Sequence, residues 1–410
     1  MTRLLPTISV TTRHSVSAYP WQVQTSLPVA GSVLGVNRLA GSGVFTYDPW
    51  ACYAAGVITS PNMVVVGQLG TGKSALVKTY LARQCLAGRS AFVLDPKGEY
   101  APFAAARGLP RLSLSPGGAD RLNPLDARPG ASAGDTSRSR SSLVAALAAS
   151  GLGRDLSAEE RAAVTAAVTE LPDDPLLGDV VTRLLDPSPS MASALRTQPG
   201  ELAAAVRPAA LELRRLLAGD LAGMVDGRTT VRLDPDGPGL VLDLSAVFGS
   251  EALPAVMVCA GTWLSAAIAH PSTRRRILLV DEAWAVLAGT ATTSWLQAVS
   301  KLARRHGVQL VTVVHRCSDL EGQSDDGTAA QAQARGLLAD AETRVIHTQA
   351  AGERGRSQQL FGLSDVEADL VTRLPPHRAL WLIGRNAAVV DHVLSDAERE
   401  LVDTDQRMTS

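Results

Sequence analysis

The feature that most constrains this chain is an eight-residue segment that matches the pattern G-x-x-x-x-G-K-S: Gly67, Gln68, Leu69, Gly70, Thr71, Gly72, Lys73 and Ser74. It follows an apolar strand pattern at 63–66 and precedes a helical pattern at 73–87. In that setting glycines let backbone N–H groups turn inward around phosphate oxygens, and the helix N-terminus adds partial positive charge. With only 35 Gly and 4 Lys in the chain, chance would produce this pattern about 0.003 times. We therefore predict a nucleotide-binding loop over residues 67–75, Ala75 included.

The expected ligands of the loop are ATP and Mg²⁺, and one side chain of the loop is predicted to bind each of them. Lys73 would bind the β- and γ-phosphates, and the Ser74 hydroxyl would bind Mg²⁺. A chance glycine-rich turn is the alternative, and the strand and helix on either side argue against it.

A second segment supplies paired carboxylates. The apolar strand pattern at 277–280 ends at Asp281 and Glu282, and open parallel sheets bind their ligands at that end of the strands. Asp281 suits Mg²⁺ binding, and Glu282 suits a base that polarises the attacking water. The alternative is a solvated acidic turn. A water-activating glutamate favours an ATPase over a small-molecule kinase.

Another acidic segment ends the strand predicted at 91–94. Asp95 and Glu99 flank a Pro-Lys-Gly turn, so either could lie near the γ-phosphate, unless this is only a turn after a strand. We prefer Glu282 as the base because it adjoins Asp281, whereas Lys97 could neutralise a base by pairing with it.

Arg304, Arg305 and His315 are further candidates around the strand pattern at 308–314. Either arginine could be an arginine finger, supplied in cis or by a neighbouring subunit, or could simply complement a helix dipole. His315 ends the strand where a γ-phosphate sensor would lie, although a lone histidine is often structural. Arg274–Arg276 lies at the start of a strand, where we expect a solvated face.

Strands alternating with helices predict an α/β fold with a mainly parallel sheet covered on both faces. Further strands are expected at 240–242, 344–346 and 379–383, and capping boxes begin helices at Ser157, Ser364 and Ser395. We expect a strand-rich lead-in at 1–60 and an ATPase domain at 61–395, followed by a helix and tail at 396–410. The domain is interrupted at 101–238 by a helical insertion with a mobile linker at 130–142.

Composition limits the partners and the compartment. A net charge of −1 argues against sequence-blind nucleic-acid binding, though a local basic ring could still contact DNA. Four widely spaced cysteines indicate a reducing compartment without a disulfide framework or zinc site. The N-terminus lacks a signal-peptide pattern, and we read the uncharged stretch 252–269 as a buried helix rather than a membrane span.

Six segments together resemble the HerA–FtsK superfamily of RecA-like P-loop ATPases, most closely its TraC-like conjugal-transfer ATPases of type IV secretion. They are GQLGTGKSALVKTYLARQ, VLDPKGEY, RLNPLD, LLVDEAW, ARRHGVQLVTVVHRCSDL and FGLSDVEADLVTRLPPHRALWLIGR, spread over roughly residues 40–408. The resemblance implies an ATP-driven homo-hexameric motor in the cytoplasm, peripheral at the inner face of the cell membrane, working with the membrane channel components of a conjugation or secretion apparatus. By position it gives the hydrolytic roles to Lys73, Ser74, Asp281 and Glu282, and the finger to Arg304 or Arg305.

Two departures from the resemblance matter. His315 stands where many such proteins carry Gln, and only about 60 residues precede the loop, whereas fuller members have a large domain there. Two other functions stay open: a DNA-translocating coupling protein or FtsK–HerA-like pump, and a nucleotide-dependent assembly protein with little turnover.

Overall fold

The structure is a computed structural model that describes residues 29–39, 43–127, 132–234, 236–250, 252–268, 272–283, 307–315 and 340–402, with single residues 27, 296, 297, 300, 336 and 338. The chain divides into two compact units. The first comprises residues 1–87, 314–318 and 338–410, and the second comprises residues 88–313 and 319–337.

The first unit contains six strands in the order β2-β1-β11-β10-β9-β3. Their bounds are β1 Ser32–Asn37, β2 Gly43–Tyr47, β3 Met63–Val66, β9 Thr343–Ile346, β10 Arg378–Ile383 and β11 Asn386–His392. Neighbours pair antiparallel except β3, which pairs parallel with β9. The N-terminal strands are thus joined through β11 to the strand that precedes the phosphate loop.

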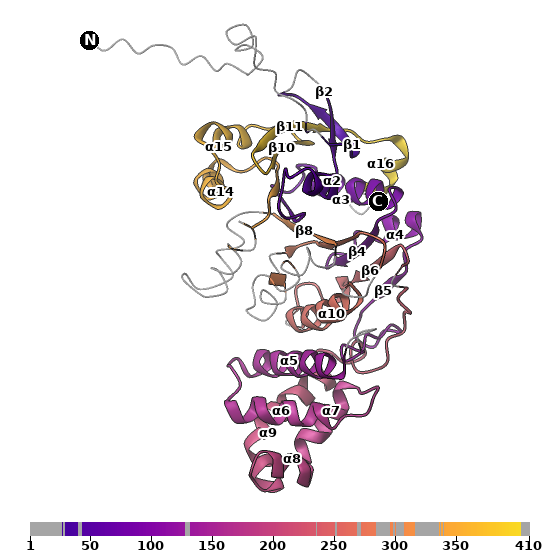
Figure 1. Cartoon of the computed structure of the whole chain (residues 1–410), viewed down its shortest axis with the longest axis vertical. Coiled ribbons are helices and arrows are strands. Elements are labelled where there is room, and N and C mark those ends of the chain that lie inside the picture. The colour runs from indigo at the N-terminus through magenta and orange to yellow at the C-terminus, as the bar shows by residue number, and fades with distance from the viewer. Residues whose placement is uncertain are drawn as a thin grey trace, which may run out of the picture. The chain divides into compact units, whose positions relative to one another are not determined.

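Helices and aromatic side chains close the core of the first unit. The helices are α2 Pro49–Ala54, α3 Lys73–Leu86, α14 Arg354–Phe361, α15 Asp365–Val371 and α16 Asp396–Val402, with a 3-10 turn η3 at Ala351–Glu353 (Figure 1). Trp381 of β10 lies 5.1 Å from Phe45 and 5.4 Å from Tyr47, measured between ring centroids, and Tyr47 lies 6.1 Å from Tyr80 of α3. Burying such large rings binds β2 and α3 firmly to the sheet, because each removes a large apolar area from water.

The second unit contains five parallel strands in the order β8-β7-β4-β6-β5. Their bounds are β4 Ser90–Asp95, β5 Arg111–Ser113, β6 Gly239–Asp243, β7 Arg276–Val280 and β8 Val308–Val314. Strands β4, β6, β7 and β8 are buried along their whole length, as expected where helices cover both faces of a parallel sheet. The unit also contains α4 Ala101–Arg107, η1 Ser245–Val247 and α10 Leu253–Ile268.

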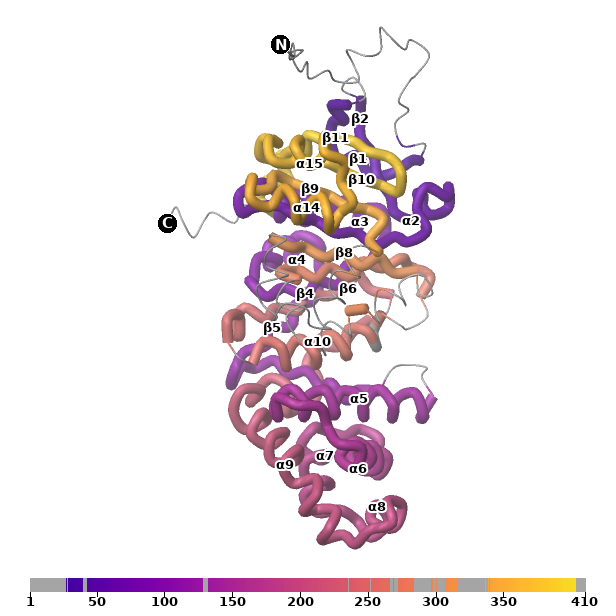
Figure 2. Tube along the Cα trace, turned by 90° about the vertical axis from the view of Figure 1, so that its left-hand side faces the viewer, coloured from indigo at the N-terminus to yellow at the C-terminus, as the bar shows by residue number. Residues whose placement is uncertain are grey.

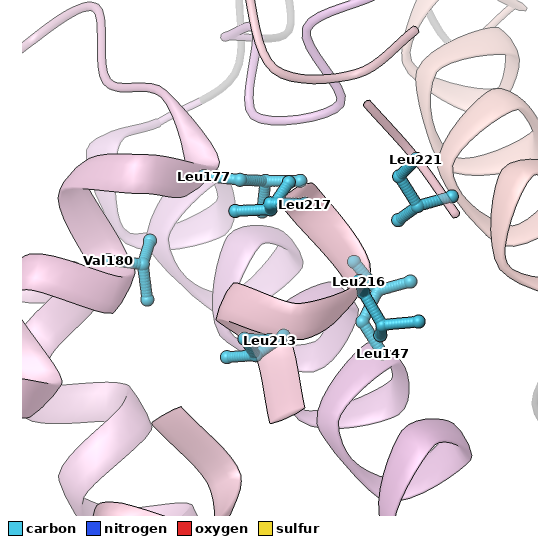
Figure 3. A pocket seen from close by; sticks show the side chains of 7 residues that line it. All are labelled: Leu147, Leu177, Val180, Leu213, Leu216, Leu217 and Leu221. Carbon is cyan, nitrogen blue, oxygen red and sulfur yellow. The ribbon is translucent and has the colours of Figure 1, made fainter. Parts of the chain in front are cut away.

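Helices α5 to α9 form a bundle within the second unit, best seen in Figure 2. They are α5 Ala133–Leu152, α6 Ala158–Thr169, α7 Leu177–Leu185, α8 Pro189–Ala194 and α9 Pro199–Ala218. The Ser157–Glu160 capping box begins α6 as predicted. Aliphatic side chains of α5, α7 and α9, together with Leu221, line a small hollow (Figure 3).

Three expectations meet corrections here. The prediction of a mobile linker at 130–142 is wrong for the described residues of that range. Helix α5 begins at Ala133, and Ser132 caps it by accepting from Asp135 N–H at 3.1 Å. Strand β5 lies inside the range expected for the insertion, yet it pairs with β6. Arg274 and Arg275 are exposed as expected, but Arg276 is not solvated: it is 1 % exposed and donates to the carbonyl of Ile268.

The uncharged stretch near 252–269 is helix α10, whose residues Val256, Met257 and Leu264 are buried. Among the described helices, none has both the length and the apolarity that crossing a bilayer would need.

Candidate functional site

The phosphate loop joins β3 to α3 in the first unit. Gly70 and Gly72 adopt φ of 74° and 98°, a region that glycine occupies without the penalty a side chain would bring. Gly72 is also the N-cap of α3 and has no side chain with which to cap the helix. The first N–H groups of a helix have no partner inside the helix, so this helix start fits binding of an anion such as a phosphate.

Lys73 folds back onto the loop that carries it. Its Nζ donates to the carbonyl oxygens of Gly67 and of Gln68, the latter at 2.7 Å, and the residue is only 4 % exposed. Thr71 Oγ1 also donates to the Gln68 carbonyl, at 2.7 Å. The ammonium group is thus held at the centre of the loop, where phosphate oxygens could replace the carbonyls as its acceptors. By contrast, Leu69 is 69 % exposed.

The end of β9 holds the loop from its other side. Gln68 N–H donates to Thr348 O at 3.0 Å, and the Thr71 carbonyl accepts from His377 N–H at 2.9 Å. His347 Nδ1 lies 3.1 Å from the same Thr71 carbonyl. Sequence reasoning missed His347 and His377. The sequence shows only that one histidine follows the β9 segment and another precedes the β10 segment. This is weak evidence for a role at the loop, because the sequence does not reveal that β9 lies beside β3.

These contacts also leave no room for a side chain on Gly67 or on Gly72. A Cβ on Gly67 would lie 2.4 Å from His347 Cβ, and one on Gly72 would lie 2.8 Å from His377 Nδ1. Both separations are far inside van der Waals contact, so these two glycines are required by close packing as well as by the turn.

The second unit brings its predicted acidic residues together. Leu94 of β4 is paired with Val280 of β7, so Asp95 and Asp281 leave the same edge of the sheet on neighbouring strands. Asp243, at the end of β6, is paired with Asp95 and was missed in the sequence. It accepts from Ser113 Oγ and Ser245 N–H, each at 2.9 Å, and from Arg111. Burial opposes its ionisation, but these hydrogen bonds prevail and lower its pKa.

The carboxyl group of Asp281 is buried among other acidic groups. It is 5 % exposed, and burial, followed by the charges of Glu282, Glu99 and Asp95, raises its pKa to about 6. Glu282 N–H donates to Asp281 Oδ1 at 2.9 Å. Buried Tyr100 lies nearby, and burial followed by the charges of Asp281 and Asp95 raises its pKa well above 10. A divalent cation would relieve this crowding of negative charge.

Glu282 is buried and conformationally restricted. It is 2 % exposed, its φ is 50°, and its carboxylate forms an ion pair with Lys97. A left-handed backbone is uncommon outside glycine and occurs preferentially at functional sites. The sequence suggested that Lys97 could pair with a base in its own turn. In the structure Lys97 pairs instead with Glu282, the preferred base.

Asp95 organises a turn. Its Oδ1 accepts from Gly98 N–H at 2.8 Å and from Glu99 N–H at 3.1 Å, while Oδ2 accepts from Tyr100 N–H at 2.9 Å. Burial nevertheless raises its pKa, with the charge of Asp243 adding to that effect. With both oxygens occupied by backbone donors, Asp95 is less suited than Glu282 to bind a water molecule. Glu99 follows in the same turn and is partly exposed.

The remaining candidates are only partly described. His315 follows β8 directly and is partly buried. Arg304 and Arg305 lie outside the described residues, so their roles stay predictions.

No protein-family model and no curated protein matches the chain, whereas solved structures do. VirB4 of Thermoanaerobacter pseudethanolicus superposes with a TM-score of 0.73 at 20% identity, covering 92% of this chain and 100% of that one. The conjugative coupling protein TrwBdeltaN70 gives a TM-score of 0.57 at 17% identity, covering 82% and 85%. TrwB in complex with ADP and Mg²⁺ gives a TM-score of 0.58 at 16% identity. The chain thus has the fold of these proteins, which confirms the predicted RecA-like α/β architecture.

Proposed function

We propose that this chain is an ATP-hydrolysing motor that powers conjugative or type IV secretion. The main support is a single observation: a fold shared with VirB4 over 92% of this chain carries both a G-x-x-x-x-G-K-S loop before α3 and paired carboxylates after β7. That pair of segments is what nucleotide hydrolysis requires.

In this proposal each predicted site residue has its own role. Lys73 exchanges the carbonyls of Gly67 and Gln68 for phosphate oxygens, while the N–H groups of the loop surround the phosphates. The Ser74 hydroxyl and the Asp281 carboxylate would hold Mg²⁺, which would neutralise charge on the phosphates. Glu282 exchanges Lys97 for the attacking water and accepts its proton.

The working assembly we propose is a ring of six copies at the inner face of the cell membrane. Arg304 or Arg305 would reach the nucleotide of a neighbouring copy as the finger, and His315 would sense the γ-phosphate. Its partners would be the channel components of a secretion apparatus.

A coupling protein that translocates DNA is the second candidate, because the TrwB structures share this fold at TM-scores near 0.57. A nucleotide-dependent assembly protein with little turnover is the third, and the Lys97–Glu282 ion pair is the feature that favours it.

The deciding experiment measures phosphate release from ATP with and without DNA over a salt series, together with the mass of the protein in solution. Hydrolysis that is indifferent to DNA, in a ring-sized species, supports the secretion motor. Stimulation by DNA that falls steeply with salt would favour the coupling protein. Nucleotide binding without hydrolysis in a confirmed ring would favour the assembly protein.

A further inference from the structure

His347 lies directly beside the start of the phosphate loop. It follows β9, whose last residue Ile346 is paired with Val66 of β3, and its N–H donates to Val66 O at 2.8 Å. The residue is 0 % exposed. Its position is therefore set by the parallel pairing of β9 with β3, and it cannot move without disturbing that ladder.

The His347 side chain lies against two points of the loop. Its Cβ occupies the space that a side chain on Gly67 would need, and its Nδ1 lies 3.1 Å from the carbonyl of Thr71. A carbonyl oxygen only accepts hydrogen bonds, so Nδ1 carries the proton and donates. Thr71 is two residues before Lys73, and its carbonyl also accepts from His377 N–H at 2.9 Å.

The second ring nitrogen has a different status. Nε2 is buried and has no hydrogen-bond partner among the described residues. In the Nδ1-protonated neutral ring it is an acceptor, which is less costly to bury than an unpaired N–H of an imidazolium. Burial, followed by the positive charge of Lys73, lowers the pKa of His347 to about 3. The charges of His392 and His377 lower this pKa further. The imidazole is therefore neutral and adds no charge beside Lys73.

We propose that His347 is a positioning residue of the phosphate loop: through an Nδ1–H···O=C bond to Thr71 it fixes the loop in the conformation that receives phosphates. The role rests on the proposed nucleotide binding, and the residue acts through the loop backbone without contacting the nucleotide.

Two conservative substitutions separate the two ring nitrogens. In His347→Asn the side-chain amide can replace Nδ1 as donor to Thr71, whereas in His347→Gln the amide reaches only the position of Nε2. We expect His347→Asn to bind Mg²⁺–ADP within about 3-fold of the parent and His347→Gln to bind it about 3- to 10-fold more weakly, the usual effect of one hydrogen bond. Isothermal titration calorimetry measures both.

Hydrogen exchange of the nucleotide-free protein provides a readout that does not depend on nucleotide. The peptide spanning 67–76 should exchange faster in His347→Gln than in the parent and in His347→Asn. His392→Gln is the matched control: it replaces another histidine of the same unit while retaining an amide near the Nε2 that lies 2.8 Å from Thr79 Oγ1. It should leave exchange of the loop unchanged.

Each outcome decides the matter. Normal binding in His347→Gln with weak binding in His347→Asn would overturn the proposal and assign the contact to Nε2. Parent-like loop exchange in both variants would also overturn it. Should both variants unfold, ¹⁵N NMR of the parent imidazole decides, since an Nε2–H tautomer is incompatible with the bond. A parent that does not bind Mg²⁺–ADP refutes the proposed function, while loop exchange still tests His347.

Discussion

Buried ionisable residues lie both at the phosphate loop of the first unit and at the acidic strand ends of the second unit, but the electrostatics of the two places are opposite. Around the loop, burial holds Lys73 against backbone carbonyls and lowers the pKa of His347 to about 3 and of His392 to about 4. At the strand ends, burial raises the pKa of Asp281 to about 6 and also raises that of Asp95.

Under the proposed function, the two places would take different parts of one reaction. The loop would receive an anion, and the acidic cluster would receive a cation and activate water. In each place, burial in the folded chain works against the charge of its own residues. Stability of the two regions should therefore respond to pH in opposite directions, and substitutions should separate binding from hydrolysis.

The largest expected effect tests whether the acidic cluster serves chemistry rather than nucleotide affinity. Glu282→Gln removes the proton acceptor while keeping shape and hydrogen bonding. We expect turnover to fall by about 10²- to 10⁴-fold, with ATP affinity near that of the parent. Steady-state phosphate release and equilibrium titration with ATP measure the two quantities.

Glu99→Gln is the matched control for Glu282→Gln, because it makes the same change in the neighbouring turn. It should retain most activity. If Glu282→Gln hydrolyses ATP at the parent rate while Glu99→Gln or Asp95→Asn is inactive with binding preserved, the base has been assigned to the wrong strand.

The next effect tests whether the loop serves affinity. Lys73→Ala removes a charged donor to phosphate, a contact that typically contributes enough for about 10- to 150-fold in affinity. The loss should be similar with Mg²⁺ and with EDTA, because Lys73 acts on the phosphates. Calorimetric titration of ADP under both conditions measures it.

Asp281→Asn makes the complementary comparison. It should weaken only the Mg²⁺-dependent part of nucleotide binding. Equal losses with Mg²⁺ and with EDTA in this variant would mean that Asp281 does not bind the metal.

A fourth prediction concerns the pH dependence of the acidic cluster without Mg²⁺. The pKa of Asp281 is raised from 3.8 to about 6 on folding, so ionisation costs stability as pH rises from about 4 to 6, and the cost is complete above that range. Asp281→Asn should therefore stabilise the protein by up to about 3 kcal/mol at pH 8 and by almost nothing near pH 4. Urea unfolding in EDTA measures the difference. Destabilisation at pH 8 would contradict the prediction.

The smallest effect has the opposite sign and lies in the first unit. The pKa of His392 is lowered from 6.5 to about 4 by burial, followed by the charge of Arg83, so its contribution is present above pH 6.5 and is lost as pH falls towards 4. The free energy of unfolding of His392→Gln, relative to that of the parent, should rise by up to about 2 kcal/mol when the pH is lowered from 8 to 5. Unfolding curves at the two pH values measure this. A pH-independent difference would mean that His392 is solvated and titrates normally.

Local sequence patterns predicted much of the core. The segment from β3 through the loop to α3 was read from consecutive residues, and so were the strand ends at Asp95 and Asp281. These predictions succeeded because a continuous apolar run, a glycine-rich turn and a helical periodicity each depend on neighbours in sequence. The capping boxes at Ser157 and Ser364 succeeded for the same reason.

Where contacts came from distant residues, local patterns misled. The polar start of α5 resembles a linker, yet Ser132 caps it, Arg140 donates to Leu125 O at 2.7 Å, and Leu143 and Leu147 of the same helix are buried. Most helical stability comes from packing one face, and that packing cannot be seen in a Ser- and Arg-rich segment alone. Likewise, Arg276 was assigned to solvent although its strand buries it.

Residues adjacent in the sequence were enough to identify a loop of the G-x-x-x-x-G-K-S pattern, a strand ending in two carboxylates, and the alternation that predicts an α/β fold. Which residues surround those groups depends on the tertiary structure. His347 supports the loop because β9 pairs with β3, 280 residues away in sequence, and Asp243 lies beside Asp95 because β6 pairs with β4. Strand order depends on packing free energy summed over the whole sheet, and no short segment of sequence contains it.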